Sequence, residues 1–539
     1  MKQKIILFLL IVTTISGSAQ VKKGLGLYTD RDVYVSGETL LAKIFNSTDN
    51  PSKIAYLDLV NQFGTRISGV SMEIRNNESN GFIQLPDSLG TGIYLLRAYM
   101  KDTAEKLKII RNIWISNRFD GLSKTKQIMQ LAETQTIQDE ITQQINIEGV
   151  EPIYATNSKA AANITINSSL LTELSGKLMV SVAQTEPTFS SSSYLWSSDI
   201  GKDGLNEKKG IILSGTIIDK NTSLPASGAT VYMTIPDSIP GFQYYQTQND
   251  GRFYFHLENY YGSIKAFVQC FPSKSTQRLK IKMDELFAAA GNLPAFSQMP
   301  IPEDFKTNAA REIDVVTFQK IFGQDILKLK AAPPKLNEAY PYYGIATTIV
   351  DPHLFIDLPN FSEISKELLQ GVKFRNYNNE PTLQVINTAA REYFSEMPLI
   401  LIDGIPIRNL NVIKDMGTQD IKRIEISQIE RFYGNLRFPG IVAIYTTKAD
   451  YSIIPESDQF IQLKLEAIQL QAELADPNIK EPDIPDLRQV FYWNPSAEPQ
   501  ENLSIKFNTS SLLGKFRVVI RGRLKDGTMF LAEKQFEVK

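Results

Sequence analysis

The side chains that most often carry out chemistry are scarce in this chain. Its 539 residues include two histidines, His256 and His353, and a single cysteine, Cys270. His256 alternates with aromatic residues in the run RFYFHL, which is typical of one face of a strand, and His353 follows a proline in an expected loop. Neither histidine belongs to an HExxH or paired-histidine pattern. We therefore expect no metal site and no cofactor.

Other catalytic patterns are missing as well. The chain has no GxSxG nucleophile elbow and no Walker-type loop. Cys270 lies in the apolar run AFVQCF, which predicts a core residue and not a nucleophile. Two acidic pairs, Asp284 with Glu285 and Glu303 with Asp304, are most simply solvated charges. The sequence thus predicts a protein that is not an enzyme, and an unrecognised active site is the weakest alternative.

The composition is that of a large globular protein. Apolar residues make up 42% and charged residues 22% of the chain, and a net charge of -2 gives no electrostatic footprint for nucleic acid. A chain of this length is expected to form roughly three to five domains. With one cysteine no intrachain disulfide can form, so we expect stability to come from burial.

The first twenty residues are expected to be a secretory signal. Lys2 and Lys4 precede a short apolar run at 5–12, and the small residues at 16–19 suit cleavage near Ala19 or Gln20. A membrane anchor is the alternative, although the apolar run is short for a span of about 20 residues. No cysteine lies near the cleavage site, so we expect an exported protein without a lipid anchor or a further transmembrane span.

The fold class predicted from the periodicity is mainly β and multidomain. Short alternating apolar runs separated by turn residues predict antiparallel β-sandwiches, and alternating strand and helix patterns predict one α+β domain. The expected parts, in chain order, are a signal peptide 1–20, a sandwich 21–117, a helical linker 118–148, part of a sandwich 149–206, a β-domain 207–280, a mixed connector 281–342, an α+β domain 343–449, a helix and linker 450–487, and a C-terminal β-module 488–539. Since 149–206 and 488–539 each hold few strands, we expect them to complete one sandwich.

Three segments resemble known families. The runs YTDRDVYVSGETLLAKIF, KIAYLDLVNQFG and GFIQLPDSLGTGIYLLRAYM resemble the MG2 domain of the alpha-2-macroglobulin family. The runs GTIIDKNTSLPASGATVYM and TQNDGRFYFHL resemble the transthyretin-like, carboxypeptidase-regulatory-like domain. Both resemblances imply non-catalytic β-sandwiches. The thioester of alpha-2-macroglobulins needs a CGEQ setting that Cys270, in QCFP, does not have.

The third resemblance is the most specific. The segment PLILIDGIPIRNLNVIKDMGTQDIKRIEISQIERFYGNLRFPGIVAIYTTK resembles the plug domain of SusC-type TonB-dependent outer-membrane receptors. Only 91 residues follow Lys448, whereas a 22-stranded barrel needs at least about 200. The resemblance therefore implies a plug without a barrel, in an accessory or scaffold subunit that binds an outer-membrane barrel protein, either a SusC-type transporter or the barrel-assembly machinery. The C-terminal runs PDLRQVFYWNP and IKFNTSSLLGKFRVVIRGRLKDG resemble the β-module that accompanies MG2-type domains in such envelope proteins. A macroglobulin-like protease-interacting protein, with residues 186–209 as bait, is the alternative.

The plug-type motif supplies the candidate interaction residues. Residues 431–440 are expected to form a loop rich in aromatic and arginine side chains, the types enriched in interface cores; alternatively, Phe432 and Tyr433 fill the domain's own core. The candidates are Asp403, Gly404, Pro406, Phe432, Tyr433, Gly434, Arg437, Phe438 and Gly440. Three Asp-Ser/Thr-apolar triplets make Ser88, Thr103 and Ser238 candidate O-glycosylation sites. The expected location is the periplasm and the outer membrane, with the cell surface as an alternative.

Overall fold

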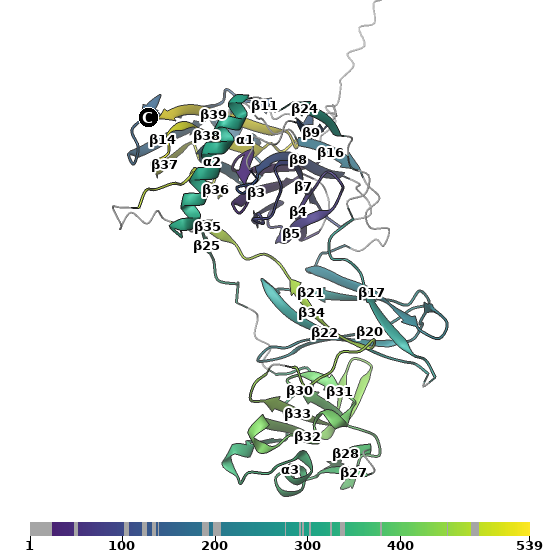
Figure 1. The fold of residues 1–539 in the computed structure, drawn as a ribbon. Helices are drawn as coiled ribbons and strands as arrows, with labels where there is room; N and C mark the ends of the chain where they lie inside the picture. Colours follow the sequence, from purple (N-terminus) through teal and green to yellow (C-terminus); the bar gives the residue numbers. More distant parts are fainter. Residues whose placement is uncertain are drawn as a thin grey trace, which may run out of the picture.

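The computed structural model describes residues 24–47, 52–101, 107–120, 127–131, 136–137, 140–185, 193–197, 206–274, 276–289, 293, 296–300, 303–323, 326–334, 340–377, 380–449, 451–475 and 484–539. These residues form a mainly β, multidomain protein. Figure 1 shows a body of two sandwiches side by side, with helix α2 (Glu303–Ile321) against them, and an arm of two smaller domains that follow one another below. The predicted signal peptide lies outside the described residues.

The first sandwich is built mainly from residues 24–116. One sheet has the strand order β1-β3-β6, and the other has the order β10-β16-β8-β7-β4-β5, with β2 beside β8. The strands are β1 (Leu25–Thr29), β2 (Val33–Val35), β3 (Thr39–Asn46), β4 (Ile54–Val60), β5 (Arg66–Glu73), β6 (Glu78–Gln84), β7 (Gly92–Tyr99), β8 (Leu107–Ser116), β10 (Thr136–Ile137) and β16 (Ser193–Ser197). Leu27, Leu57 and Leu96 are fully buried between the sheets, and burying each such side chain contributes about 1.5–3 kcal/mol.

The second sandwich joins two distant parts of the chain. Strand β15 lies between β36 and β38, and β14 pairs with β37, so residues 140–184 and 490–538 share both sheets and one core. The strands are β11 (Glu140–Ile141), β12 (Ile145–Glu148), β13 (Ile153–Tyr154), β14 (Lys159–Ile166), β15 (Leu178–Gln184), β36 (Val490–Ala497), β37 (Asn502–Asn508), β38 (Gly514–Arg523) and β39 (Met529–Val538). Helix α1 (Ser168–Glu173) connects β14 to β15. The two segments that the sequence analysis placed in one sandwich are therefore paired in this way.

The inner arm domain follows β16 in the chain. Its sheets have the orders β18-β17-β21, with β23 beside β17, and β20-β19-β22-β34. The strands are β17 (Ile211–Asp219), β18 (Leu224–Pro225), β19 (Thr230–Ile235), β20 (Gly241–Gln246), β21 (Arg252–Leu257), β22 (Ser263–Phe271), β23 (Leu279–Met283) and β34 (Phe460–Glu466). Because β34 comes after the outer arm domain in the chain, the outer domain is an insertion into the inner one.

The outer arm domain comprises residues 340–449 and has α+β architecture. Its main sheet has the order β26-β32-β33-β30-β31, and a second sheet has the order β27-β28-β29. The strands are β26 (Thr348–Val350), β27 (Val372–Tyr377), β28 (Glu380–Asn387), β29 (Glu392–Tyr393), β30 (Leu399–Ile402), β31 (Ile405–Ile407), β32 (Ile421–Tyr433) and β33 (Leu436–Thr446). Helix α3 (Phe361–Glu367) and the 3-10 turns η2 (Pro352–Leu354), η3 (Leu410–Val412) and η4 (Thr418–Asp420) complete the domain.

Two further pairs of short strands complete the structure. Strand β24 (Phe296–Pro300) pairs with β9 (Gln127–Leu131), and β25 (Leu327–Leu329) pairs with β35 (Ala472–Leu474). The expected connector at 281–342 is thus mixed, with one helix and two short strands.

Two expected helices are wrong. The described parts of 118–148 form β9, β10, β11 and β12, and the described parts of 450–487 form β34 and β35. In β34 the side chains of Ile461, Leu463 and Leu465 alternate toward the core of the inner arm domain, which is the two-residue period of a strand. Strands elsewhere in the chain pair with both segments, and the sequence of neither segment shows where these partners lie.

Candidate interaction site

The Asp403–Gly404 pair makes the hairpin turn between β30 and β31. Both residues have positive φ, 47° and 85°, as a type I′ turn requires. The Asp403 carboxylate accepts hydrogen bonds from the Thr446 backbone N (2.8 Å) and the Thr446 Oγ1 (2.6 Å), which ties the turn to β33. A Cβ atom at Gly404 would lie 2.2 Å from Pro240 Cγ. The turn is therefore pressed against the inner arm domain.

Strand β31 continues the same contact. The carbonyl of Pro406 accepts a buried hydrogen bond of 2.6 Å from Gln269 Nε2 of the inner arm domain. Ile405 is buried with Phe267 and Phe460, and the Arg408 guanidinium lies 3.9 Å from the centroid of the Phe271 ring. The first part of the plug-type motif is thus an interface within the chain.

Residues 431–440 form a hairpin and not the expected loop. Strands β32 and β33 pair along this segment, and Gly434, with φ 57°, lies in the turn. Gly440 lies inside β33, next to the point where the register with β32 shifts. It therefore accommodates an irregularity in a long paired strand.

Tyr433 and Gly434 lie at the junction between the arm domains. The Tyr433 hydroxyl donates to the carbonyl of Phe242 (3.0 Å), and the backbone N of Asn435 donates to the Tyr244 hydroxyl (2.9 Å). The rings of Phe242 and Tyr342 stack with centroids 4.2 Å apart. Burial raises the pKa of the Tyr342 hydroxyl well above its usual value. This junction is an aromatic contact that also contains two hydrogen bonds.

The other candidates in the hairpin have different surroundings. Phe438 is 5% exposed and packs with Tyr343 and Leu401 in the core of the outer domain. Arg437 forms ion pairs with Glu396 and Glu430 on the domain surface. Phe438 is therefore a core residue, so its truncation would destabilise the domain. Phe432 is 65% exposed and remains available to a partner.

Another group of exposed apolar residues of the outer domain lies near strand β26. Within twelve residues at the β26 edge of the main sheet, five large apolar side chains are more than half exposed, and among the described strands β26 pairs with β32 alone. These residues are Ile345, Ile349, Leu354, Phe355 and Ile356, and we call them the edge patch. Val350, in the same strand, instead points into the core. None of the residues predicted from the plug-type motif belongs to the edge patch.

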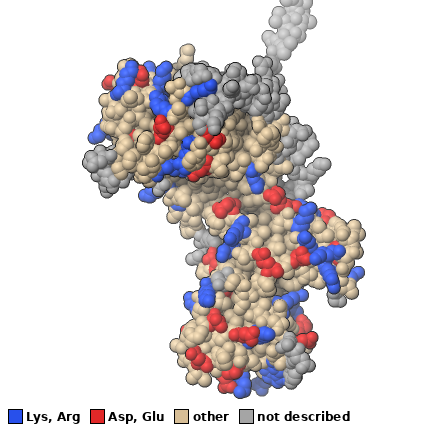
Figure 2. All heavy atoms as spheres, in the orientation of Figure 1, with Lys and Arg blue, Asp and Glu red and all other residues tan. Residues whose placement is uncertain are grey.

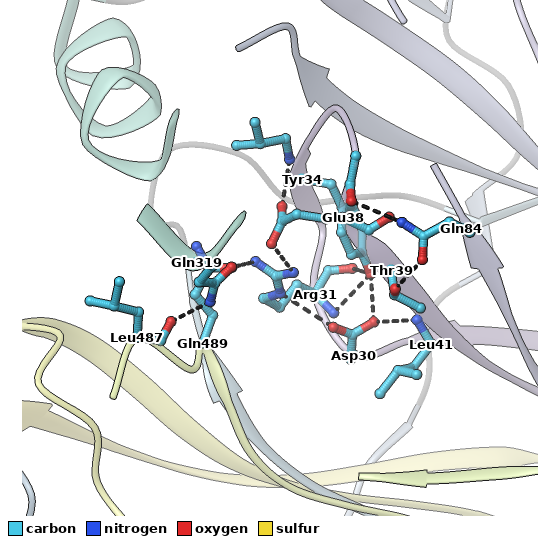
Figure 3. A network of polar contacts seen from close by, with 12 residues as sticks. Asp30, Arg31, Tyr34, Glu38, Thr39, Leu41, Gln84, Gln319, Leu487 and Gln489 are labelled. Atoms are coloured by element: carbon cyan, nitrogen blue, oxygen red, sulfur yellow. Dashed lines mark hydrogen bonds and ion pairs between the residues drawn. The ribbon is translucent and has the colours of Figure 1, made fainter. Parts of the chain in front are cut away.

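A polar network holds the body together (Figure 3). Arg31 is buried and bonds to Asp30 (3.2 Å), to Glu38 (2.8 Å) and to the side-chain oxygen of Gln489 in the second sandwich. The Tyr34 hydroxyl donates to Asp30 Oδ1 (2.8 Å). Burial raises the pKa of the Asp30 and Glu38 carboxyls, although Arg31 opposes this effect. Burial disfavours the charge of Arg31, but Glu38 and Asp30 more than offset this and raise its pKa.

Helix α2 also contacts the second sandwich beside this network. Gln319 Nε2 donates to the carbonyl of Leu487, which lies just before β36. A pocket of about 170 Å³ opens beside these groups, lined by residues of the first sandwich, α2 and the second sandwich. The network lies within the resemblance motif YTDRDVYVSGE, but the sequence analysis did not single out Arg31. The sequence feature that could have indicated this network is an arginine between acidic residues in a strand-turn-strand pattern, because a buried charge needs a partner.

Catalytic and metal-binding groups do not come together in the described residues. His256 and His353 are both exposed, on β21 and in η2, and no group of three or more His, Cys, Asp or Glu side chains there could hold a metal ion. Cys270 is buried, and burial raises the pKa of its thiol to about 12. In the described part of the chain, no helix is both long and apolar enough to cross a membrane.

Two of the three candidate glycosylation sites are placed. Ser88 and Ser238 are exposed in turns, whereas Thr103 and most of the candidate bait segment 186–209 lie outside the described residues. Figure 2 shows acidic and basic side chains interspersed over the face it presents, as expected from the small net charge.

Comparisons with known proteins identify no family. No protein-family model matches the chain, and no curated protein matches it. Among solved structures, a Salmonella alpha-2-macroglobulin reacted with methylamine is 11% identical over 96% of this chain with a TM-score of 0.22, and the native conformation of E. coli alpha-2-macroglobulin is 10% identical over 98% with a TM-score of 0.23. This chain spans 39% and 40% of those chains. TM-scores this low describe loose superpositions, so they carry no argument about architecture or function.

Proposed function

We propose that this protein is an exported, non-enzymatic scaffold subunit that binds an outer-membrane barrel protein through its outer arm domain. The observation that carries the proposal is the edge patch. Five large apolar side chains exposed within twelve residues exceed the scattered single apolar residues that a folded domain normally exposes. The resemblance of this domain to receptor plugs supports a barrel protein as the partner.

The arrangement of the chain supports the same role. The plug-type residues Gly404, Pro406 and Tyr433 are occupied by the inner arm domain. This contact orients the outer domain and leaves the side chains of the edge patch exposed. A scaffold needs such a division between an internal joint and an external surface.

Affinity purification from detergent-solubilised outer membranes tests the proposal. The full chain should enrich an identified barrel protein, and the double variant Leu354→Ser/Phe355→Ser should lose it, because both side chains are more than half exposed. Phe63→Ser/Phe119→Ser is the matched control, since these residues are 81% and 71% exposed on the first sandwich. Retention of the barrel protein by the edge-patch variant, or enrichment of no barrel protein by the natural chain, would contradict the proposal.

A further inference from the structure

We infer that the β26 edge is a strand-docking site, to which a partner protein adds one extended, antiparallel strand. This inference rests on the proposed function and specifies how its binding surface works. It identifies the partner by chemistry: a strand of alternating apolar residues with a basic residue at its start and an acidic residue at its end.

The edge is formed by a strand that has one partner among the described strands. β26 pairs antiparallel with β32, placing Ile349 opposite Glu425 and Val350 opposite Ile424. Val350 is buried in the core, whereas Ile349 is 65% exposed on the other face. Soluble proteins usually protect such edges with charges, proline or a covering segment. Here Asp351 and Pro352 follow the strand, but the side chains at 349 and 354–356 are exposed isoleucine, leucine and phenylalanine.

The charges along the edge give it a direction. At its start, the Arg431 guanidinium donates to the carbonyl of Ile345 (2.8 Å). At its end, Asp351 and Asp357 are both exposed on either side of the apolar residues 354–356. The edge is therefore basic where it begins, acidic where it ends and apolar between.

This polarity specifies the added strand. An antiparallel partner begins beside the end of β26 and finishes beside its start. Its first residues then face Asp351 and Asp357, and its last residues face Arg431. Opposite charges across strands are favourable and like charges are not, so a strand of reversed polarity should bind about fivefold more weakly. We choose the antiparallel direction because it continues the β26–β32 ladder and gives the more stable pairing.

Fluorescence anisotropy of the full chain with labelled peptides tests the inference. The probe is Lys-Thr-Val-Thr-Val-Thr-Glu, compared with the same peptide in which the terminal charges are exchanged. A third peptide carries backbone N-methyl groups on alternate residues, which removes strand hydrogen bonds and keeps the side chains. We expect the first peptide to bind about fivefold more tightly than the second and at least about tenfold more tightly than the third.

Three variants localise the binding. Ile349→Asp should abolish peptide binding, whereas Ile153→Asp, at a 52% exposed isoleucine of strand β13, should not change it. Asp351→Asn keeps the side-chain oxygen that accepts from the His353 backbone N (3.0 Å) but removes the charge, so it should narrow the preference between the two charged peptides. Unchanged thermal melting of Ile349→Asp checks that the domain remains folded.

Other outcomes overturn either the inference or the proposed function. Equal binding of the N-methylated peptide would make the edge an apolar surface without strand pairing. A dimer of the full chain in light scattering that Ile349→Asp dissociates would make a second copy the occupant. If the probe fails to bind while Leu354→Ser/Phe355→Ser loses the barrel protein, strand docking is wrong and the proposed function stands. If the probe binds as expected but no barrel protein is enriched, the proposed function fails instead.

Discussion

The two sandwiches of the body are joined by buried charges, whereas the two domains of the arm are joined by aromatic rings. In the body, Arg31 and its carboxylate partners are buried between the sandwiches and α2. In the arm, Tyr433 and the stacked rings of Phe242 and Tyr342 form the joint between the two domains. A buried charge cluster is stable only when all its members are present, whereas an aromatic contact loses stability in proportion to the area removed.

This difference indicates which of the two joints tolerates single substitutions. The charged joint fixes one geometry, because each hydrogen bond has a direction and each charge needs its partner. The aromatic joint holds the outer domain with apolar area and a few hydrogen bonds, so single changes there should have smaller effects. The following predictions test this contrast, from the largest expected effect to the smallest.

Replacement of Arg31 should have the largest effect. Arg31→Met leaves the buried carboxylates of Asp30 and Glu38 without their cation, so the free energy of unfolding should fall by about 3–5 kcal/mol. Urea denaturation measures it. Lys320→Met is the control, since the Lys320 side chain is 39% exposed and its Nζ lies 3.9 Å from Asp87 Oδ1, and it should cost less than about 1 kcal/mol. Equal costs for the two variants would remove the distinction between the joints.

Phe438 and Phe432 separate a core residue from a surface residue in one hairpin. Phe438→Ala should lower the free energy of unfolding of the outer domain by about 3 kcal/mol, because it opens a cavity beside Leu401. Phe432→Ala, at a 65% exposed side chain, should change it by less than about 0.5 kcal/mol. Denaturation followed by tyrosine fluorescence compares them, and a harmless Phe438→Ala would refute the assignment of this residue to the core.

Removal of the Tyr433 hydroxyl tests how much its hydrogen bond stabilises the aromatic joint. Tyr433→Phe removes the hydrogen bond to the Phe242 carbonyl and keeps the ring, so it should cost about 1–2 kcal/mol. Faster cleavage between the arm domains in limited proteolysis would report the loosened joint. Tyr340→Phe, at a tyrosine that is 57% exposed, is the control. If the two variants are cleaved at the same rate, the hydroxyl contributes nothing to the joint.

The smallest effect concerns Cys270 in the inner arm domain. Burial raises the pKa of its thiol from 9.0 to about 12. A raised thiol pKa means that its stabilising contribution is complete below about pH 9 and is lost as the pH rises toward 12. Between pH 9 and 10 the free energy of unfolding should fall by about 1 kcal/mol more in the natural chain than in Cys270→Val. Parallel pH profiles of the two proteins would contradict the burial of the thiol.

Local patterns were enough to predict many of the elements. The alternating apolar runs predicted a mainly β, multidomain protein, and the low strand content of 149–206 and 488–539 predicted that they complete one sandwich. The Asp403–Gly404 turn agrees with residue type, because Asp and Gly both tolerate positive φ. Segments whose own period was ambiguous were predicted wrongly. The described parts of 118–148 became strands because other strands offered them backbone partners.

The candidate site also could be predicted only in part from local sequence. Residue type alone marked the aromatic and arginine residues near Tyr433 as interface residues. Only the tertiary structure decided that Tyr433 faces Phe242 in the same chain, that Phe438 lies in the core and that the edge patch is exposed. The physical reason is that a residue's chemistry limits what it can contact, whereas its burial depends on which distant strand packs against it. Local sequence therefore determined the kinds of element in this protein, and the pairing of distant strands decided which of their faces remain free.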